Sequence, residues 1–92
     1  MPALRFYYSD SIENFLRKPT NEIVGNLALA HAHDINQKTS MSWVEEIDIL
    51  KSALANFSGR GSVYFEYNIP RMGRRADVVA LIDGIVLVME FK

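Results

Sequence analysis

The chain has 92 residues, 49% of them hydrophobic and 23% charged, with a formal net charge of −1 at pH 7. This composition excludes a disordered chain and predicts one small globular domain over residues 1–92, in which any nucleic-acid-binding surface must be local. The absence of cysteine excludes disulfides and zinc–thiolate sites and suits the cytoplasm. No apolar run reaches the length of a membrane span and no Gly-x-x-x-x-Gly-Lys-Ser/Thr loop occurs, so we expect neither membrane insertion nor ATPase activity.

The first third of the chain carries helix signals. Leu4–Tyr8 is a short apolar and aromatic run, expected to form a strand or an extended lead-in. Ser9 or Asp10 can cap a short helix that ends near Arg17, because the residue before the following proline avoids helical geometry. A second helix is expected over about 20–33, followed by a polar connector.

The third helix is the best defined and is expected from Trp43 to about Phe57. Ser42 and Glu45 have the spacing of a capping box, which gives Glu45 a structural role at the helix start. Glu46 instead falls inside the buried arc of this helix. The apolar face at helical spacing consists of Trp43, Ile47, Leu50, Leu54 and Phe57.

Three consecutive strands are expected after the helices, paired as an antiparallel meander. The first, Val63–Ile69, alternates cleanly between two faces, as a half-buried strand does. The next two, Ala76–Ile82 and Ile85–Phe91, flank Asp83-Gly84, which is typical of a two-residue hairpin turn. That turn places Ile82 opposite Ile85 and sets the register of the whole hairpin. The predicted fold class is therefore α+β, with helices first and the sheet after them.

The hairpin register gathers three charged residues on one face of the sheet. Asp77 stands opposite Glu90, with side chains about 5 Å apart, and Lys92 points to the same face. Both faces are otherwise apolar, which predicts a sheet covered on both sides. Charged groups there are costly unless they bind something or pair with one another. Two such carboxylates suit Mg²⁺ or Mn²⁺, and the lysine is placed to hold a water or to stabilise negative charge on a phosphate.

The spacing Asp77-x12-Glu90-x-Lys92 across a hairpin resembles the signature of the PD-(D/E)XK nuclease superfamily. The wider wording FEYNIPRMGRRADVVALIDGIVLVMEFK, with SWVEEIDIL upstream, is similar to the N-terminal nuclease-like region of a bacterial family of schlafen-like helicase proteins. This resemblance covers nearly the whole chain. It implies a restriction-endonuclease-like core that is truncated at its C-terminus, with a helicase/ATPase region following.

The resemblance also implies roles for individual residues. Asp77, Glu90 and the backbone carbonyl of Phe91 would hold one or two Mg²⁺ or Mn²⁺ ions, and Lys92 would be a catalytic residue. An additional helix-borne acid is expected, for which Glu46 is the candidate. The rival for that role is Glu66, on the polar side of its strand.

Three arginines, Arg71, Arg74 and Arg75, immediately precede the first acid. Guanidinium groups match two phosphate oxygens, so these residues are expected to contact a DNA or RNA backbone without reading its sequence. His31 and His33 do not form a metal motif, because residues two apart on a helix diverge by about 200°.

Other interpretations of the same residues stay open. The acids and the lysine could be a structural salt-bridge cluster, with Arg74 or Arg75 neutralising Glu46. The chain could then be a non-catalytic nucleic-acid-binding or regulatory module of a helicase/ATPase, or a purely structural fragment. An unpaired edge strand would also allow two copies of the chain to form a homodimer.

Overall fold

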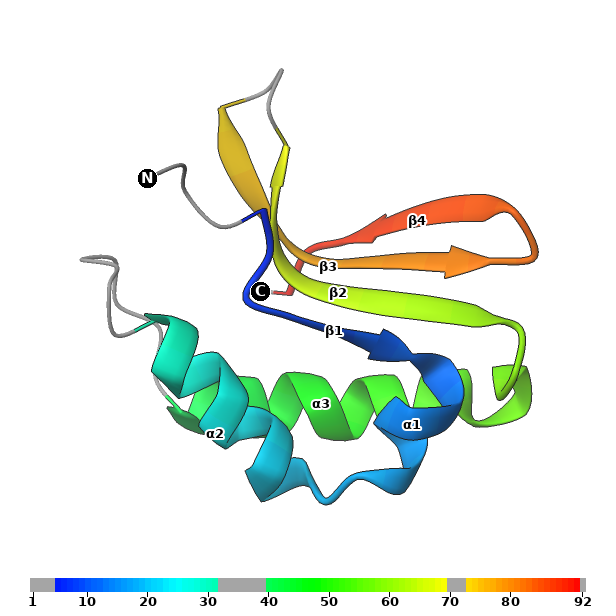
Figure 1. Ribbon diagram of the computed structural model, residues 1–92, viewed down its shortest axis with the longest axis horizontal. Helices are drawn as coiled ribbons and strands as arrows, with labels where there is room; N and C mark the ends of the chain where they lie inside the picture. The colour runs from blue at the N-terminus through cyan, green and yellow to red at the C-terminus, as the bar shows by residue number, and fades with distance from the viewer. Residues whose placement is uncertain (1–4, 32–39, 70–72, 92) are drawn as a thin grey trace.

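The computed structural model describes residues 5–31, 40–69 and 73–91, with three helices and a four-stranded sheet (Figure 1). In chain order the elements are β1 (Tyr8–Ser11), α1 (Ile12–Arg17), α2 (Thr20–His31), α3 (Ser40–Leu54), the short 3₁₀ helix η1 (Ala55–Phe57), β2 (Gly61–Ile69), β3 (Arg74–Ile82) and β4 (Ile85–Met89). The strand order is β1-β2-β3-β4, and every neighbouring pair is antiparallel. The α+β class and the antiparallel meander are confirmed.

The sheet has one strand more than the three that the sequence predicts. β1 pairs with β2 from Tyr8↔Phe65 to Ser11↔Ser62, and the residues before it continue alongside β2. There the Tyr7 N–H donates to the Phe65 carbonyl at 2.9 Å, and the Asn68 N–H donates to the carbonyl of Arg5 at 2.6 Å. The polar stretch Tyr8–Ser11 has weak strand propensity of its own, so this strand depends on a distant partner.

The same polar stretch also begins α1. The helix is capped by Ser11, whose hydroxyl accepts from the Asn14 N–H at 3.1 Å. The predicted cap at Ser9 or Asp10 was therefore wrong by one or two residues, because α1 begins only at Ile12.

Asp10 instead organises a polar cluster between β1 and the end of α1. Its Oδ2 accepts from the Tyr8 hydroxyl at 2.9 Å and from Lys18 Nζ at 2.7 Å, and its Oδ1 accepts from the Ser11 N–H at 2.9 Å and from Asn14 Nδ2 at 3.2 Å. Partial burial raises the pKa of Asp10, but the four hydrogen bonds outweigh it and hold the pKa below the ordinary value.

We expect Asp10→Asn to lower the free energy of unfolding by about 1–2 kcal/mol at pH 7, because a charged acceptor of four hydrogen bonds is lost. A depressed carboxyl pKa stabilises the fold above the unfolded value of 3.8 and stops doing so as the pH falls through the folded value. The difference in free energy of unfolding between the variant and the unaltered chain should therefore become smaller below pH 3.8. Urea unfolding across an acidic pH series measures it.

The control is Glu13→Gln, which removes an exposed ion pair to Arg17 on the neighbouring helix turn. It should change the free energy of unfolding by no more than about 0.5 kcal/mol. Equal effects of the two substitutions at pH 7 would show that the Asp10 cluster contributes nothing specific.

The helices pack against one face of the sheet, and the core lies between these two layers (Figure 1). Four residues of the predicted apolar face are buried on α3, with Trp43, Ile47, Leu50 and Leu54 at most 4% exposed. The fifth, Phe57, is half-buried and lies in η1, because α3 ends at Leu54. As predicted, Glu45 is exposed and Glu46 is buried, at 5% exposure. The capping box at Ser42 was wrong, because the helix already begins at Ser40.

The β3–β4 hairpin has the predicted turn and register. Asp83 and Gly84 have φ of 52° and 83°, which is the type I′ geometry that joins twisted strands with two residues. Five pairs follow, from Ile82↔Ile85 to Val78↔Met89. The turn is also tied to the loop before β2, since the Asp83 N–H donates to the Arg60 carbonyl at 3.1 Å and the two side chains form an ion pair.

The alternation predicted for β2 holds only in its first half. Val63 and Phe65 are fully buried under the helices, as expected. Beyond them Glu66 has a left-handed φ of 55°, which reverses the faces of the residues that follow. Tyr67 consequently lies with Tyr64 on the opposite face, with ring centroids 5.8 Å apart.

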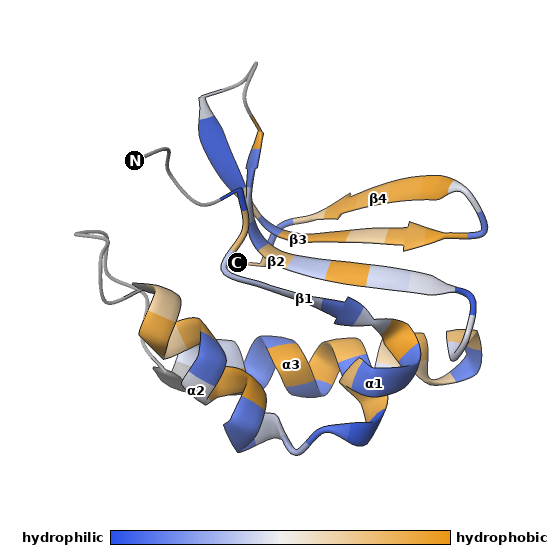
Figure 2. Cartoon of the chain, in the orientation of Figure 1, coloured by the Kyte–Doolittle hydropathy of each residue, from blue (hydrophilic) through white to orange (hydrophobic). Residues whose placement is uncertain are grey.

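The expectation of a sheet covered on both sides was wrong for the residues described. All the described helices lie on one side, so the opposite face of β3 and β4 is open (Figure 1). β4 is exposed on both faces, and Figure 2 shows it as a hydrophobic strand beside the hydrophobic part of β3. The exposed fractions are 61% for Ile85, 59% for Val86, 43% for Leu87 and 52% for Val88.

Candidate functional site

The two predicted acids lie at the end of the β3–β4 ladder away from the turn. Asp77 is on β3, half-buried, and by strand alternation it shares the open face with Val79. β4 ends at Met89, so Glu90 lies one residue beyond the last ladder pair, Val78↔Met89. The register therefore brings Asp77 and Glu90 to the same end of the hairpin, but the regular ladder stops just before them.

Each acid has a partner of its own. Asp77 Oδ2 accepts from the backbone N–H of Phe91 at 2.7 Å. A Glu90 carboxylate oxygen pairs with Arg74 at 3.1 Å, with 56% of the arginine side chain and 35% of the glutamate side chain exposed. The first contact ties β3 directly to the residue whose carbonyl was predicted to be a metal ligand. The second neutralises Glu90 with a residue that the sequence assigned to phosphate or to Glu46.

Glu46 lies on α3, on the helix-covered side of the sheet, among the core residues. Within residues 5–31, 40–69 and 73–91, no three His, Asp or Glu side chains lie together as a metal-ligand group. The structure therefore does not gather Glu46, Asp77 and Glu90 into one cluster of three carboxylates. It does place the Phe91 N–H on the Asp77 carboxylate, and Glu90 is the residue next to Phe91 in the chain.

Arg75 has contacts that fix its position. Its Nη1 donates to the backbone carbonyl of Glu66 at 2.8 Å, and its guanidinium lies 4.6 Å from the centroid of the Tyr7 ring. Glu66, the rival acid, is half-buried, and the β2–β3 ladder skips both Glu66 and Asp77 between the pairs Phe65↔Val78 and Tyr67↔Ala76. Lys92 and Arg71, the remaining predicted residues, lie outside the described part of the chain.

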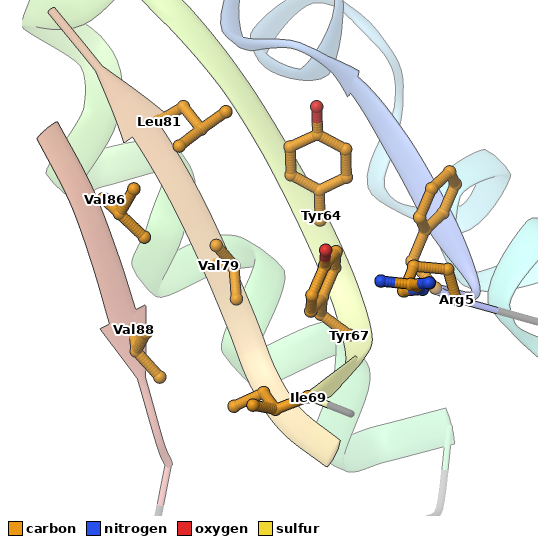
Figure 3. Close-up of a pocket in the computed structure, with 9 residues that line it drawn as sticks. Arg5, Tyr64, Tyr67, Ile69, Val79, Leu81, Val86 and Val88 are labelled. Carbon is orange, nitrogen blue, oxygen red and sulfur yellow. The ribbon is translucent and has the colours of Figure 1, made fainter. Parts of the chain in front are cut away.

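Beside the acids, the open face of the sheet forms an apolar trough of about 430 Å³ (Figure 3). Tyr64 and Tyr67 stand on one side of it, Val86 and Val88 on the other, and β3 runs between them. Its lining residues are Arg5, Phe6, Tyr64, Tyr67, Ile69, Val79, Leu81, Val86 and Val88.

The sequence analysis missed this trough and the role of Arg74. The trough depends on the left-handed Glu66, which nothing in the alternation of β2 announces. The Arg74–Glu90 pair could not be read from the hairpin register, because that register places Asp77, three residues after Arg74, opposite Glu90.

Comparison with known proteins gives this chain no relative. No protein-family model, no curated protein and no solved structure matches it. In the described residues no helix has the length and apolar character needed to cross a membrane.

Proposed function

We propose that this chain is a metal-dependent nuclease-like domain of the PD-(D/E)XK type, which hydrolyses phosphodiester bonds in DNA or RNA in association with a helicase/ATPase. The observation that carries the proposal is that Asp77 and Glu90 lie at the same end of one hairpin, where the Phe91 N–H contacts Asp77 Oδ2 at 2.7 Å. Asp77 is on β3, Glu90 and Phe91 directly follow β4, and a two-residue turn joins the two strands, which suits the positioning of a site.

The donor chemistry fits Mg²⁺ or Mn²⁺. Two carboxylates and a backbone carbonyl are hard oxygen donors, and in the proposed site they are those of Asp77, Glu90 and Phe91. A bound divalent ion would activate water and offset negative charge on the phosphodiester.

The basic residues would position the substrate. Arg74 and Arg75 lie at the start of β3, where planar guanidinium groups can pair with two phosphate oxygens. Lys92 would orient a water or stabilise a phosphate oxygen. Glu46 would act in this site only after a rearrangement that carries it to the hairpin end.

The second candidate function is a non-catalytic nucleic-acid-binding or regulatory module. The Arg74–Glu90 ion pair favours it, because this pair satisfies one of the two acids without a metal. The two functions differ in one measurable property, which is the affinity of the hairpin end for a divalent ion.

We expect calorimetric titration with Mn²⁺ to detect binding to the 92-residue chain, and both Asp77→Asn and Glu90→Gln to weaken it at least about tenfold, as loss of one charged ligand should. The asparagine keeps an oxygen that can accept the Phe91 N–H, so the fold should survive. Arg74→Gln should strengthen Mn²⁺ binding, because it removes the competing cation from Glu90.

Glu45→Gln, which changes an exposed acid on α3, is the matched control and should bind Mn²⁺ as the unaltered chain does. A folded chain that binds no Mn²⁺ at millimolar concentration would refute the metal site and leave the binding module as the better function. If Mn²⁺ binds, the next experiment measures Mg²⁺-dependent cleavage of DNA and RNA. Cleavage that is as fast in the Asp77→Asn variant as in the unaltered chain would refute the catalytic assignment.

A further inference from the structure

β4 is an edge strand that lacks the usual protection against pairing. It is the last strand in the order β1-β2-β3-β4, so within the described residues its outer edge has no neighbour. Edge strands are normally protected by charged residues, proline or a bulge. Ile85–Met89 has neither charge nor proline, and its ladder with β3 is regular over all five pairs. The opposite edge, β1, is polar and carries the charged Asp10.

The backbone of β4 determines what can pair with it. Residues that flank a two-residue turn exchange hydrogen bonds, and bonded and non-bonded pairs then alternate along the hairpin. With Ile82 opposite Ile85, the residues that bond to β3 are Ile85, Leu87 and Met89. The N–H and C=O groups of Val86 and Val88 consequently point to the open edge. An added strand must be extended and must match these two positions.

A second β4 meets this requirement. In an antiparallel arrangement about a two-fold axis at Leu87, Val86 of one copy faces Val88 of the other, and both have backbone groups directed at the partner. The exposed side chains on both faces then meet apolar side chains of the same kind. We infer that two copies of this chain associate through β4, and that the two sheets join into one.

The charges at the two ends of β4 allow this arrangement. The turn end carries the Arg60–Asp83 ion pair, and the other end carries the Arg74–Glu90 ion pair. Antiparallel pairing brings the turn end of one copy next to the Glu90 end of the other. Each of these ion pairs carries no net charge, so bringing the two pairs together adds no like-charge repulsion between them. A two-fold contact of this kind closes on itself and stops at the dimer.

Strands of five residues bury less than the roughly 800 Å² per partner of a standard protein interface, so this dimer should dissociate on dilution. Sedimentation velocity and light scattering across micromolar to millimolar protein concentration measure the change. The weight-average mass should rise from that of one chain towards that of two, and no further. The inference does not depend on the proposed metal site, and the experiment is done without added divalent ions.

Two variants test the contact itself. Leu87→Lys places two like charges opposite each other at the two-fold axis, and Val86→Pro removes an N–H that β3 does not use. Both should raise the dimer dissociation constant at least about tenfold, as a charge or a proline on a pairing edge does. The control is Leu29→Lys, the same change at a residue of α2 that is 74% exposed, and it should leave the dimer dissociation constant unchanged.

Circular dichroism and a cooperative urea transition establish that each variant is folded. A folded chain that stays monomeric at millimolar concentration would overturn the inference and leave β4 to a strand of a different protein. Species larger than a dimer would also overturn the inference. So would a folded Leu87→Lys or Val86→Pro variant that dimerises as the unaltered chain does. An equal loss of dimer affinity in Leu29→Lys would overturn it as well.

Discussion

Gly61→Ala should lower the free energy of unfolding by about 3 kcal/mol, because the added methyl group has no space. Gly61 begins β2 and pairs with Ile82 on β3. A Cβ built on it lies 1.7 Å from the carbonyl oxygen of Leu81 and 2.8 Å from the carbonyl carbon, and both are backbone atoms. The two strands must therefore separate at the point where the hairpin turn meets the loop before β2. For a chain of this size the midpoint of thermal unfolding should fall by about 12–20 °C.

Gly25→Ala is the matched control, since no atom lies within 4 Å of a Cβ at that position in α2. Alanine loses less backbone entropy than glycine in a helix, so this change should raise the free energy of unfolding by about 0.5–1 kcal/mol. The two substitutions should thus have opposite signs in urea or thermal unfolding. A Gly61→Ala protein as stable as the unaltered chain would mean that β2 and β3 are farther apart than described.

Phe15→Ala should be the most costly truncation in the helix layer, at about 3–5 kcal/mol. The side chain of Phe15 is fully buried although α1 has only six residues. Its ring centroid lies 5.7 Å from that of Phe65 on β2 and 5.9 Å from Lys51 Nζ on α3. So short a helix is not stable alone, and the contacts of Phe15 with β2 and α3 stabilise it.

Denaturant unfolding measures the loss, with Leu29→Ala as the control at a residue of α2 that is 74% exposed. The control should change the free energy of unfolding by no more than about 0.5 kcal/mol. Similar effects of the two truncations would show that α1 is not anchored through Phe15.

The parts of the fold that could be predicted from sequence are those that local patterns determine. Asp83-Gly84 determines both the turn and the register, because a two-residue loop leaves one alignment of the strands. Trp43, Ile47, Leu50 and Leu54 identify the buried face of α3, and with it the burial of Glu46. These signals need no knowledge of distant contacts.

The parts that failed depend on residues far away in the chain. β1 is a strand because β2 lies beside it, and its own polar sequence favours a cap or turn. Glu66 adopts a left-handed backbone that asparagine or glycine would have signalled and glutamate does not. The open face of the sheet was missed because the sequence of an apolar strand does not reveal whether another layer packs on it.

The candidate site divides in the same way. The hairpin register places Asp77 and Glu90 at the same end of the hairpin, and the contact from the Phe91 N–H to Asp77 lies just beyond the last ladder pair. The ion pair from Arg74 to Glu90 depends on side-chain conformations, which spacing alone does not determine. The burial of Glu46 followed from helix periodicity, but periodicity does not say which face of the sheet the acid meets.

The position of β1 has a consequence for the order of folding. Its partner residues on β2 lie more than fifty positions further along the chain, whereas β2, β3 and β4 join through short connections. Closing so long a loop is entropically costly, so we expect the two hairpins to form early and β1 to join last. In the sequence, α1, α2 and α3 all lie between β1 and β2. The final pairing of β1 with β2 would therefore complete the packing of these helices against the sheet. The amide hydrogens of β1 that are bonded to β2 should then exchange with solvent only through opening of the whole domain or detachment of this strand.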